Sequence, residues 1–194
     1  MQEARKEYKF IYSKQELYLF LNSFENNLKS IYPERIINSL YLDTPNNKYY
    51  FDAINNDVNK EKLRFRQYGS QNQIYFEKKI NNSLGKFKDK EKVNIKSFNE
   101  VEDIFYKGNT LSPVLEVSYL RKYYSFKNVR ITIDDNIIFI STKNRTFNKV
   151  QMGFDKIIVE FKLFDSNPDI ESSFVSNPIA YSKFINGMEV VYNL

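Results

Sequence analysis

The sequence contains no cysteine, no histidine and no tryptophan among its 194 residues. Without cysteine, the chain has no disulfide, thiol nucleophile or thiolate zinc site. Without histidine, acid–base catalysis and metal binding through imidazole are excluded. The five glycines are scattered, so there is no glycine-rich phosphate loop. Any chemistry must therefore use lysine, arginine, carboxylate, tyrosine, serine or threonine side chains.

Long apolar runs are also absent, and none approaches the roughly 20 residues that span a bilayer. The opening stretch MQEARKEYKF carries charges but lacks the apolar segment of a signal peptide. These features predict a cytoplasmic protein with no membrane segment of its own. Hydrophobic residues make up 42% of the chain, which is enough for a folded core, and the net charge of +5 is compatible with an anionic partner.

The spacing of apolar residues predicts a mainly antiparallel α+β fold in one domain, residues 1–194. Period-two alternation predicts about eight strands, within the segments 5–12, 35–42, 48–55, 61–69, 72–80, 85–95, 112–126, 128–137 and 155–164. Helical spacing and capping boxes at Ser13–Glu16 and Ser97–Glu100 predict helices over 13–30 and 97–109, the latter ended by Gly108. The Asn-Pro pair at 177–178 predicts the start of a third helix, over 177–188.

Within EKLRFRQYG, Lys62, Arg64 and Arg66 fall on one strand face, and Leu63 and Phe65 on the other. A half-solvated sheet is the ordinary explanation of such a face. The pattern recurs in most of the predicted strands, which favours a closed barrel with a wet, cationic lumen that binds an anion. Arginine and lysine suit phosphate, and nearby acids suit Mg²⁺ or Mn²⁺. The residues therefore favour metal-assisted phosphoryl chemistry.

Eight segments follow one another in the order of a known family: RKEYKF, SLYLDTPNNKYY, KLRFRQYG, YFEKK, VSYLRKYY, VRITIDDNI, IVEFK and YSKFING. With these segments the chain resembles the VTC domain, the polyphosphate polymerase branch of the triphosphate tunnel metalloenzymes (the CYTH-like superfamily). The resemblance implies an eight-stranded antiparallel closed β-barrel, the triphosphate tunnel, with a few flanking helices. It also implies transfer of the ATP γ-phosphate onto a polyphosphate chain with Mn²⁺ or Mg²⁺.

The resemblance also implies a set of site residues by matching positions. Phosphate would be held for catalysis by Arg64, Arg66, Lys79, Arg121, Arg130 and Lys183. Further substrate contacts would come from Lys9, Lys88, Lys90, Tyr119 and Ser182, with the register of the lysines over 86–90 left open. The metal ligand would be Glu160, with Glu7 and Glu77 as further choices. The alternative for these acids is an ion pair that holds the arginines in place.

Three positions depart from the family pattern. Ala180 occupies a place where the polymerase branch often has a basic residue, lysines stand in GKFKDKEKV where a Lys-x-Arg pair is expected, and Arg5 replaces the first acid of the superfamily's opening strand. The expected partners are ATP or another triphosphate, and polyphosphate or pyrophosphate. A triphosphatase and a non-catalytic polyphosphate-binding module are the alternatives. Nucleic acid is not expected, because Glu7, Glu77 and Glu160 would repel its backbone.

Overall fold

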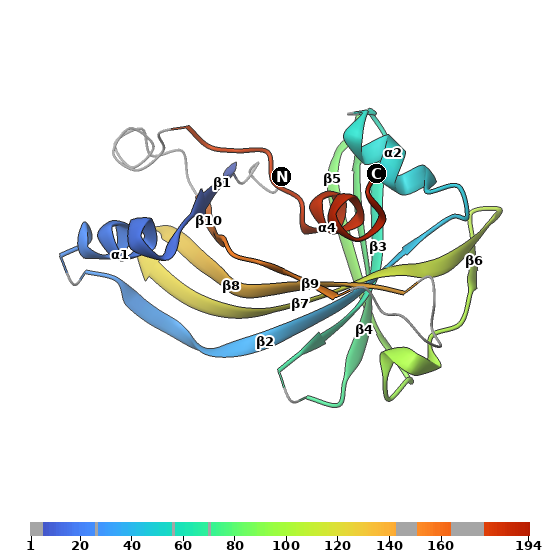
Figure 1. Cartoon of the computed structure of the whole chain (residues 1–194), viewed down its shortest axis with the longest axis horizontal. Helices are drawn as coiled ribbons and strands as arrows, with labels where there is room; N and C mark the ends of the chain where they lie inside the picture. Colours follow the sequence, from blue (N-terminus) through green and yellow to red (C-terminus); the bar gives the residue numbers. More distant parts are fainter. Residues whose placement is uncertain (1–5, 26, 56, 70, 143–150, 164–176) are drawn as a thin grey trace. The chain divides into compact units, whose positions relative to one another are not determined.

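The computed structural model of the chain describes residues 6–25, 27–55, 57–69, 71–142, 151–163 and 177–194. Within them the backbone forms ten strands, three α-helices and one short 3₁₀ helix, Phe98–Glu100 (Figure 1). The strands are β1 (Lys6–Tyr12), β2 (Lys29–Asp43), β3 (Lys60–Tyr68), β4 (Ile74–Asn82), β5 (Gly85–Val93), β6 (Ile104–Tyr106), β7 (Asn109–Phe126), β8 (Val129–Ser141), β9 (Gln151–Phe154) and β10 (Ile157–Leu163). The helices are α1 (Lys14–Asn22), α2 (Lys48–Ile54) and α4 (Lys183–Tyr192). None of the described helices has the length and apolar character needed to cross a bilayer.

The strands pair in the order β1-β10-β8-β7-β2-β3-β4-β5, while β6 pairs with β7 and β9 with β8. The pairings of β1 with β10, β10 with β8, β2 with β3, β3 with β4 and β4 with β5 are antiparallel. This order confirms the mainly antiparallel α+β part of the fold prediction. Among the described residues, β1 and β5 stand at the two ends of the order without pairing to each other. Closure of the sheet into a barrel therefore stays a prediction.

The chain divides into two compact units. Unit 1 comprises residues 1–35, 119–137 and 154–181, and unit 2 comprises residues 36–118, 138–153 and 182–194. Strands β2, β7 and β8 each contribute residues to both units. The organisation of residues 1–194 as a single domain stays a prediction.

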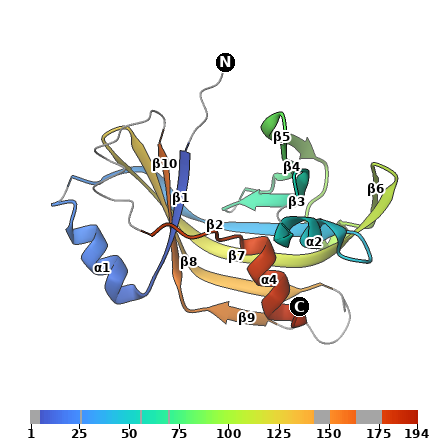
Figure 2. The same cartoon turned by 90° about the horizontal axis from the view of Figure 1, so that it is seen from above.

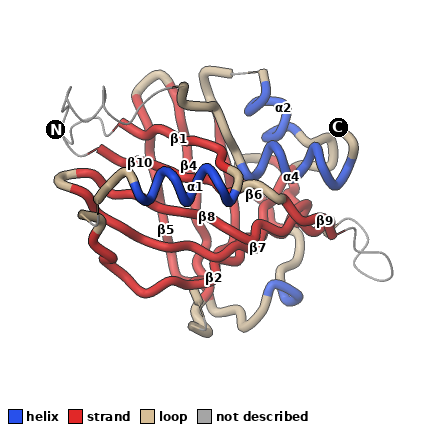
Figure 3. The backbone as a smooth tube through the Cα atoms, turned by 60° about the vertical axis from the view of Figure 1, so that its left-hand side comes forward, coloured by secondary structure: helices blue, strands red, loops and turns tan. Residues whose placement is uncertain are grey.

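Unit 1 buries an apolar face of its strands against α1 (Figure 3). Phe10 of β1 and Phe161 of β10 pack edge to face, with ring centroids 5.5 Å apart, and Phe20 of α1 packs on Phe161 at 5.7 Å. The predicted capping box begins α1: Ser13 N donates to Glu16 Oε2 at 2.7 Å, and Glu16 N donates to Ser13 Oγ at 3.2 Å. These bonds satisfy backbone donors that a helix start otherwise leaves open. The opposite face of the same strands is thereby left to polar side chains.

Unit 2 places α2 beside α4 (Figure 2). Phe184 of α4 stacks on Tyr41 of β2, with ring centroids 5.1 Å apart. Gly187 lets α4 approach the sheet closely, because a Cβ there would lie 2.5 Å from a methyl of Leu115 and 2.8 Å from the ring of Phe139. Helix α4 therefore packs directly against β7 and β8 within this unit.

The predicted strand over 48–55 is wrong, because this segment forms α2. The buried carboxylate of Asp43 accepts hydrogen bonds from Tyr49 N and Tyr50 N, each at 2.9 Å. A carboxylate bonded to these amides stabilises a helix start. This local cap outweighs the strand preference of the tyrosines and phenylalanine in the segment.

The predicted helix over 97–109 is also wrong. Only Phe98–Glu100 form a helical turn, and the Ser97 side chain makes no capping hydrogen bond. Ile104–Tyr106 instead form β6, which pairs with the start of β7. Gly108, with φ 78°, turns the chain between these two strands and is not a helix stop.

Two other helices have different limits from those predicted. Helix α4 begins at Lys183, not at 177, because Ser182 is its N-cap and accepts a hydrogen bond from Ile185 N at 3.4 Å. Helix α1 ends at Asn22 and does not continue to 30, since Glu25 adopts φ 46°, outside the helical region. Leu28 still packs against the unit 1 core from beyond the helix.

Candidate functional site

Strands β2, β3 and β4 of unit 2 align predicted site residues in rows across one face. Arg64 is the cross-strand partner of both Tyr41 and Glu77, and Arg66 is the partner of Ser39. Directly opposed residues of paired strands point to the same face. The register therefore brings Arg64, Arg66 and Glu77 together, as the alternation in the sequence predicted for the two arginines.

The carboxylate of Glu77 is the centre of this cluster and is 2% exposed. Arg64 donates to Glu77 Oε2 from Nε at 3.0 Å and from Nη2 at 2.7 Å, and Arg66 Nη1 lies 3.6 Å from the same oxygen. Tyr68 OH donates to Oε1 at 2.6 Å. Burial alone would raise the pKa of Glu77, but Arg64 and Arg66 lower it to about 2. Both oxygens are thus engaged, which favours the ion-pair alternative for Glu77 over metal binding.

Tyr41 is a site residue that the sequence reasoning missed. Its hydroxyl accepts a hydrogen bond from Arg64 Nη1 at 3.0 Å, and the side chain is buried. Burial would raise the pKa of Tyr41, but the charges of Arg64 and Arg66 lower it to about 8. The signal was present, because Tyr41 lies within SLYLDTPNNKYY and at the strand parity that opposes Arg64.

On the same face, a row of lysines lies two residues along the strands from the Arg64–Glu77 pair. Lys62, Lys79 and Lys88 are cross-strand partners on β3, β4 and β5. Lys88 Nζ lies 3.6 Å from Glu77 Oε1, and Lys90 Nζ lies 3.8 Å from the ring centre of Tyr75. Like charges at this spacing repel one another, so the row is stabilised when an anion lies against it.

Ser182 and Lys183 enter unit 2 at the start of α4. Lys62 Nζ donates to Ser182 Oγ at 2.8 Å. Lys183 is the first residue of the helix, where the helix dipole adds partial positive charge. Of the unit 2 predictions, Arg64, Arg66 and Lys88 contact Glu77. Lys79 and Lys90 lie on the same face, and Ser182 contacts Lys62 of this face. Lys183 begins α4 directly after Ser182.

Unit 1 has its own charged face, opposite the side covered by α1. Lys9, Glu160 and Thr132 form one cross-strand row, and Glu7, Lys162 and Arg130 form the next. Lys162 Nζ bridges the two acids, at 2.7 Å from Glu7 Oε1 and 3.2 Å from Glu160 Oε1. Lys9 Nζ donates to the backbone oxygen of Tyr181 at 2.7 Å.

Arg121 is fixed by Asp134 within unit 1. Arg121 donates from Nε and Nη2 to the two carboxylate oxygens of Asp134, at 2.5 and 2.6 Å, and lies 5.2 Å from the ring centre of Tyr119. Burial would lower the pKa of Arg121, but Tyr119, Asp134 and Glu160 raise it well above its ordinary value. A two-point ion pair sets the direction of the guanidinium. Asp134 is therefore a positioning residue for Arg121.

Arg130 and Arg35 both contact Tyr123. The sequence reasoning predicted Arg130 as a site residue but missed Arg35 and Tyr123. The guanidinium carbons lie 5.5 and 4.9 Å from the Tyr123 ring centre, and Arg35 Nε donates to Tyr123 OH at 2.9 Å. Arg130 Nε is buried and makes no hydrogen bond to the described residues. Tyr123 has the same strand parity in β7 as Tyr119 and Arg121, so the period-two alternation could have indicated it.

No group of three or more acids suited to bind a metal occurs in the described part of the chain. Magnesium sites that contain phosphate need only one or two carboxylates, since phosphate and water supply the other oxygens. Glu160 and Glu7 are both within reach of Lys162, and the buried Thr132 Oγ1 beside Glu160 has no hydrogen-bond partner among the described residues. These oxygens fit a hard divalent cation.

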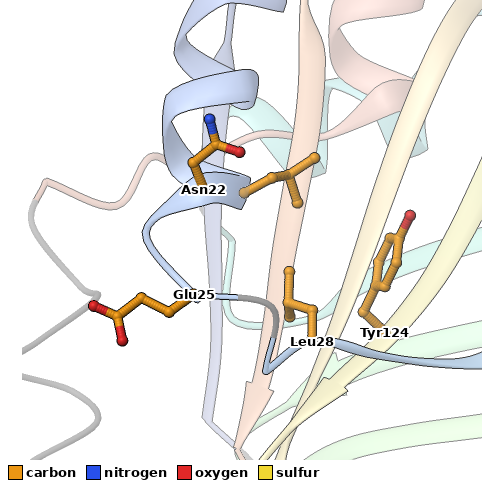
Figure 4. Close-up of a pocket in the computed structure, with 5 residues that line it drawn as sticks. Asn22, Glu25, Leu28 and Tyr124 are labelled. Carbon is orange, nitrogen blue, oxygen red and sulfur yellow. The ribbon is translucent and has the colours of Figure 1, made fainter.

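A pocket of about 450 Å³ lies beside α1 in unit 1 (Figure 4). Its lining is formed by Leu21, Asn22, Glu25, Leu28 and Tyr124. It contains one acid and no cation, so it does not fit the chemistry of an anion. It therefore lies outside the candidate site.

Solved structures with low sequence identity share the fold of the chain. An adenylate cyclase candidate from Bacillus halodurans has a TM-score of 0.59 at 11% identity, covering 96% of this chain and 98% of its own. The PH1819 protein from Pyrococcus horikoshii has a TM-score of 0.59 at 16% identity, over 95% and 96%. HpAC1 from Hippeastrum, an adenylyl cyclase candidate with a dominant triphosphatase activity, has a TM-score of 0.53 at 12% identity, over 96% of each chain. These similarities show that the chain shares the fold of these three structures.

The family follows from the sequence itself. The model of the VTC domain matches residues 4–102 and 81–192. These segments span most of the chain, so the chain belongs to the VTC domain family, as its eight motifs predicted. No curated protein matches the chain.

Proposed function

We propose that this VTC domain is a metal-dependent phosphotransferase that moves the γ-phosphate of ATP onto a polyphosphate chain. The observation that carries the proposal is the Arg64–Arg66 pair, which one buried carboxylate, Glu77, holds on a face lined by further lysines. Such an arrangement orients two guanidinium groups before any ligand binds, so their ordering costs little on binding. Planar guanidinium groups match phosphate oxygens in two-point contacts.

The remaining predicted residues have roles that follow from their placement. In unit 2, Lys79, Lys88, Lys90 and Lys183 supply point charges, and Ser182 supplies a hydroxyl. In unit 1, Lys9, Arg121 and Arg130 bind phosphate and Tyr119 supports Arg121. The transferred group gains negative charge on its oxygens, which these fixed cations stabilise.

Glu160, with Glu7 beside it, would hold Mn²⁺ or Mg²⁺. The metal supplies Lewis acidity toward phosphate oxygens when it is bound. The chain's own contribution is to fix these carboxylates through Lys162, which contacts both of them. No histidine is required for this chemistry.

Two alternatives use the same cations. If water is the acceptor, the domain is a triphosphatase, and the dominant triphosphatase activity of HpAC1, which has the same fold, is in favour of this reaction. If no transfer occurs, the domain is a polyphosphate-binding module. ATP consumption separates the two enzymes from the module, and the product separates the enzymes from each other.

The test is an assay of purified protein with ATP and Mn²⁺, with and without pyrophosphate as primer, for long-chain polyphosphate and for free phosphate. Arg66→Lys keeps the charge but removes the two-point contact, so we expect the rate to fall roughly 100-fold. Lys78→Gln is the matched control, since Lys78 lies on the opposite face of β4 and pairs with Asp89. It should leave the rate within about twofold of wild type.

Each result assigns one function. Long chains that are lost in Arg66→Lys but kept in Lys78→Gln establish the polymerase. Free phosphate without chains, with the same response to the variants, establishes the triphosphatase. Tight polyphosphate binding without either product establishes the binding module and overturns the proposed transfer.

A further inference from the structure

A second pocket of unit 1, of about 530 Å³, lies where β2 passes the turn between β7 and β8. It is lined by Ile31, Tyr32, Ser125, Lys127, Asn128, Val129 and Arg130. Two of these residues are cations, three others carry neutral polar groups that can donate hydrogen bonds, and none is an acid. The sequence reasoning singled out only Arg130 of this set.

The two cations differ from the arginines Arg64 and Arg121, which are fixed by ion pairs. Arg64 and Arg121 have carboxylate partners within 3 Å, at Glu77 and Asp134. Lys127 and Arg130 make no ion pair with the part of the chain that the structure describes. Positive groups gathered without compensating acids attract an anion and are stabilised by it.

A further cation, Arg35, lies near the pocket, against the ring of Tyr123. Tyr123 is 2% exposed and is contacted by the guanidinium groups of Arg35 and Arg130 and, edge to face, by the ring of Tyr32. Glu34, the acid next to Arg35 in the sequence, lies 3.9 Å from Lys122. Both arginines therefore pack against the same aromatic ring, which positions Arg130 beside the pocket.

The strand register connects this pocket with the predicted metal ligand. Glu160 and Thr132 form one cross-strand row, and Lys162 and Arg130 form the next row toward the β7–β8 turn. Asn128 lies two residues before Arg130 in the chain. Rows two residues apart are separated by roughly 7 Å, so the pocket lies roughly 7 Å from the Glu160 row at Arg130 and roughly 13 Å from it at Asn128. A phosphate chain that passes along this face would reach the pocket after leaving the Glu160 row.

We propose that the pocket around Lys127 and Arg130 is a second anion subsite, which binds the part of a phosphate chain that extends beyond a triphosphate. The inference rests on the proposed function, because it adds a length-dependent contact to the same phosphate-binding face. Lys127, Asn128 and Ser125 bind the extended chain through charge and hydrogen bonds, while Arg35 holds Tyr123 under Arg130. The subsite gives long chains an advantage over tripolyphosphate.

The experiment measures the affinity of the full chain for tripolyphosphate and for long-chain polyphosphate by titration calorimetry without metal or ATP. In Lys127→Gln the affinity for the long chain should fall about tenfold, and the affinity for tripolyphosphate should change less than about twofold. Lys122→Gln is the control, since it removes the same charge from β7 at a position that pairs with Glu34. Residue 127 has a φ of 50°. Glutamine, like lysine, is a non-glycine residue with an unbranched Cβ, so the substitution leaves the backbone strain at this position unchanged.

The outcomes separate the subsite from the proposed function. A selective loss for the long chain in Lys127→Gln, absent in Lys122→Gln, supports the subsite. If the affinity falls equally for both ligands, or for neither, the subsite is overturned. Binding of both ligands by the wild type would still support the phosphate-binding face. Absence of binding of both ligands to the wild type overturns the proposed function and the subsite together.

Discussion

Replacing Glu77 with glutamine tests the buried ion cluster of unit 2. The carboxylate is 2% exposed and accepts hydrogen bonds from Arg64 and Tyr68, with Arg66 nearby. Glutamine preserves the size of the side chain but removes its charge, so Arg64 and Arg66 lose the carboxylate that they contact. The structural consequence should be a loss of stability without a change in the fold.

The expected magnitude follows from the pKa of Glu77. A value of about 2, against an ordinary 4.5, corresponds to about 3 kcal/mol of stabilisation of the folded state at neutral pH. Solvent near the exposed Lys88 screens part of this interaction, so we expect Glu77→Gln to lower the free energy of unfolding by about 2 kcal/mol. Because the pKa is lowered on folding, the stabilisation is complete above pH 4.5 and is lost as the pH falls toward 2.

The assay is urea unfolding followed by circular dichroism, at about pH 7 and about pH 3, for wild type and Glu77→Gln. The gap in unfolding free energy between them should narrow markedly at the acid pH. Glu91→Gln is the control, since Glu91 lies on the exposed strand β5 and should change stability by less than about 0.5 kcal/mol. A gap that stays constant between the two pH values would refute the electrostatic reasoning.

Two further predictions concern packing and capping. Gly187→Ala should lower the melting temperature, with a loss of about 1–3 kcal/mol, because its Cβ would overlap Leu115 and Phe139; Gly153→Ala, with nothing within 4 Å of its Cβ, is the control, and equal melting temperatures for both variants would contradict the described packing of α4. Ser13→Ala removes the N-cap of α1 and should cost about 1 kcal/mol in urea unfolding, whereas Ser13→Asp should retain most of that stability.

The strands that carry the charged faces could be predicted because their side chains alternate locally. Arg64 and Arg66 alternate with Leu63 and Phe65, and the structure buries these apolar residues on the face opposite the Arg64–Glu77 pair. The turn after Tyr68 also predicts the β3–β4 hairpin, which brings Glu77 opposite Arg64. Signals of this kind need only neighbouring residues, so a single sequence contains them.

The errors arise where a contact with residues outside a segment overrides the structural preference of the segment itself. The segment 48–54 is rich in tyrosine and phenylalanine, yet it is helical because Asp43 accepts hydrogen bonds from Tyr49 and Tyr50. No residue within the segment indicates these hydrogen bonds to Asp43. In the same way, Ile104–Tyr106 form a strand because β7 offers a partner, although the preceding Ser97–Glu100 pair is typical of a helix start.

The site was predictable in its charges but not in its supporting residues. Lys9 and Glu160 lie some 150 positions apart in the sequence and become neighbours only through the pairing of β1 with β10. Tyr41 and Tyr123 have no charge to draw attention, and their roles follow from the arginines that contact them. Only the register of the sheet makes these associations visible.

Strand β5 has one neighbour, β4, in the described pairing, and its residues from Gly85 to Lys92 are exposed. An open strand edge can recruit another chain, and alternate lysines oppose this through repulsion between copies. Neutralising those lysines, by substitution or by a bound polyanion, removes the electrostatic repulsion that opposes association of the copies. Titration with polyphosphate near charge equivalence should therefore be followed by light scattering, since condensation of the protein would otherwise be read as tight binding.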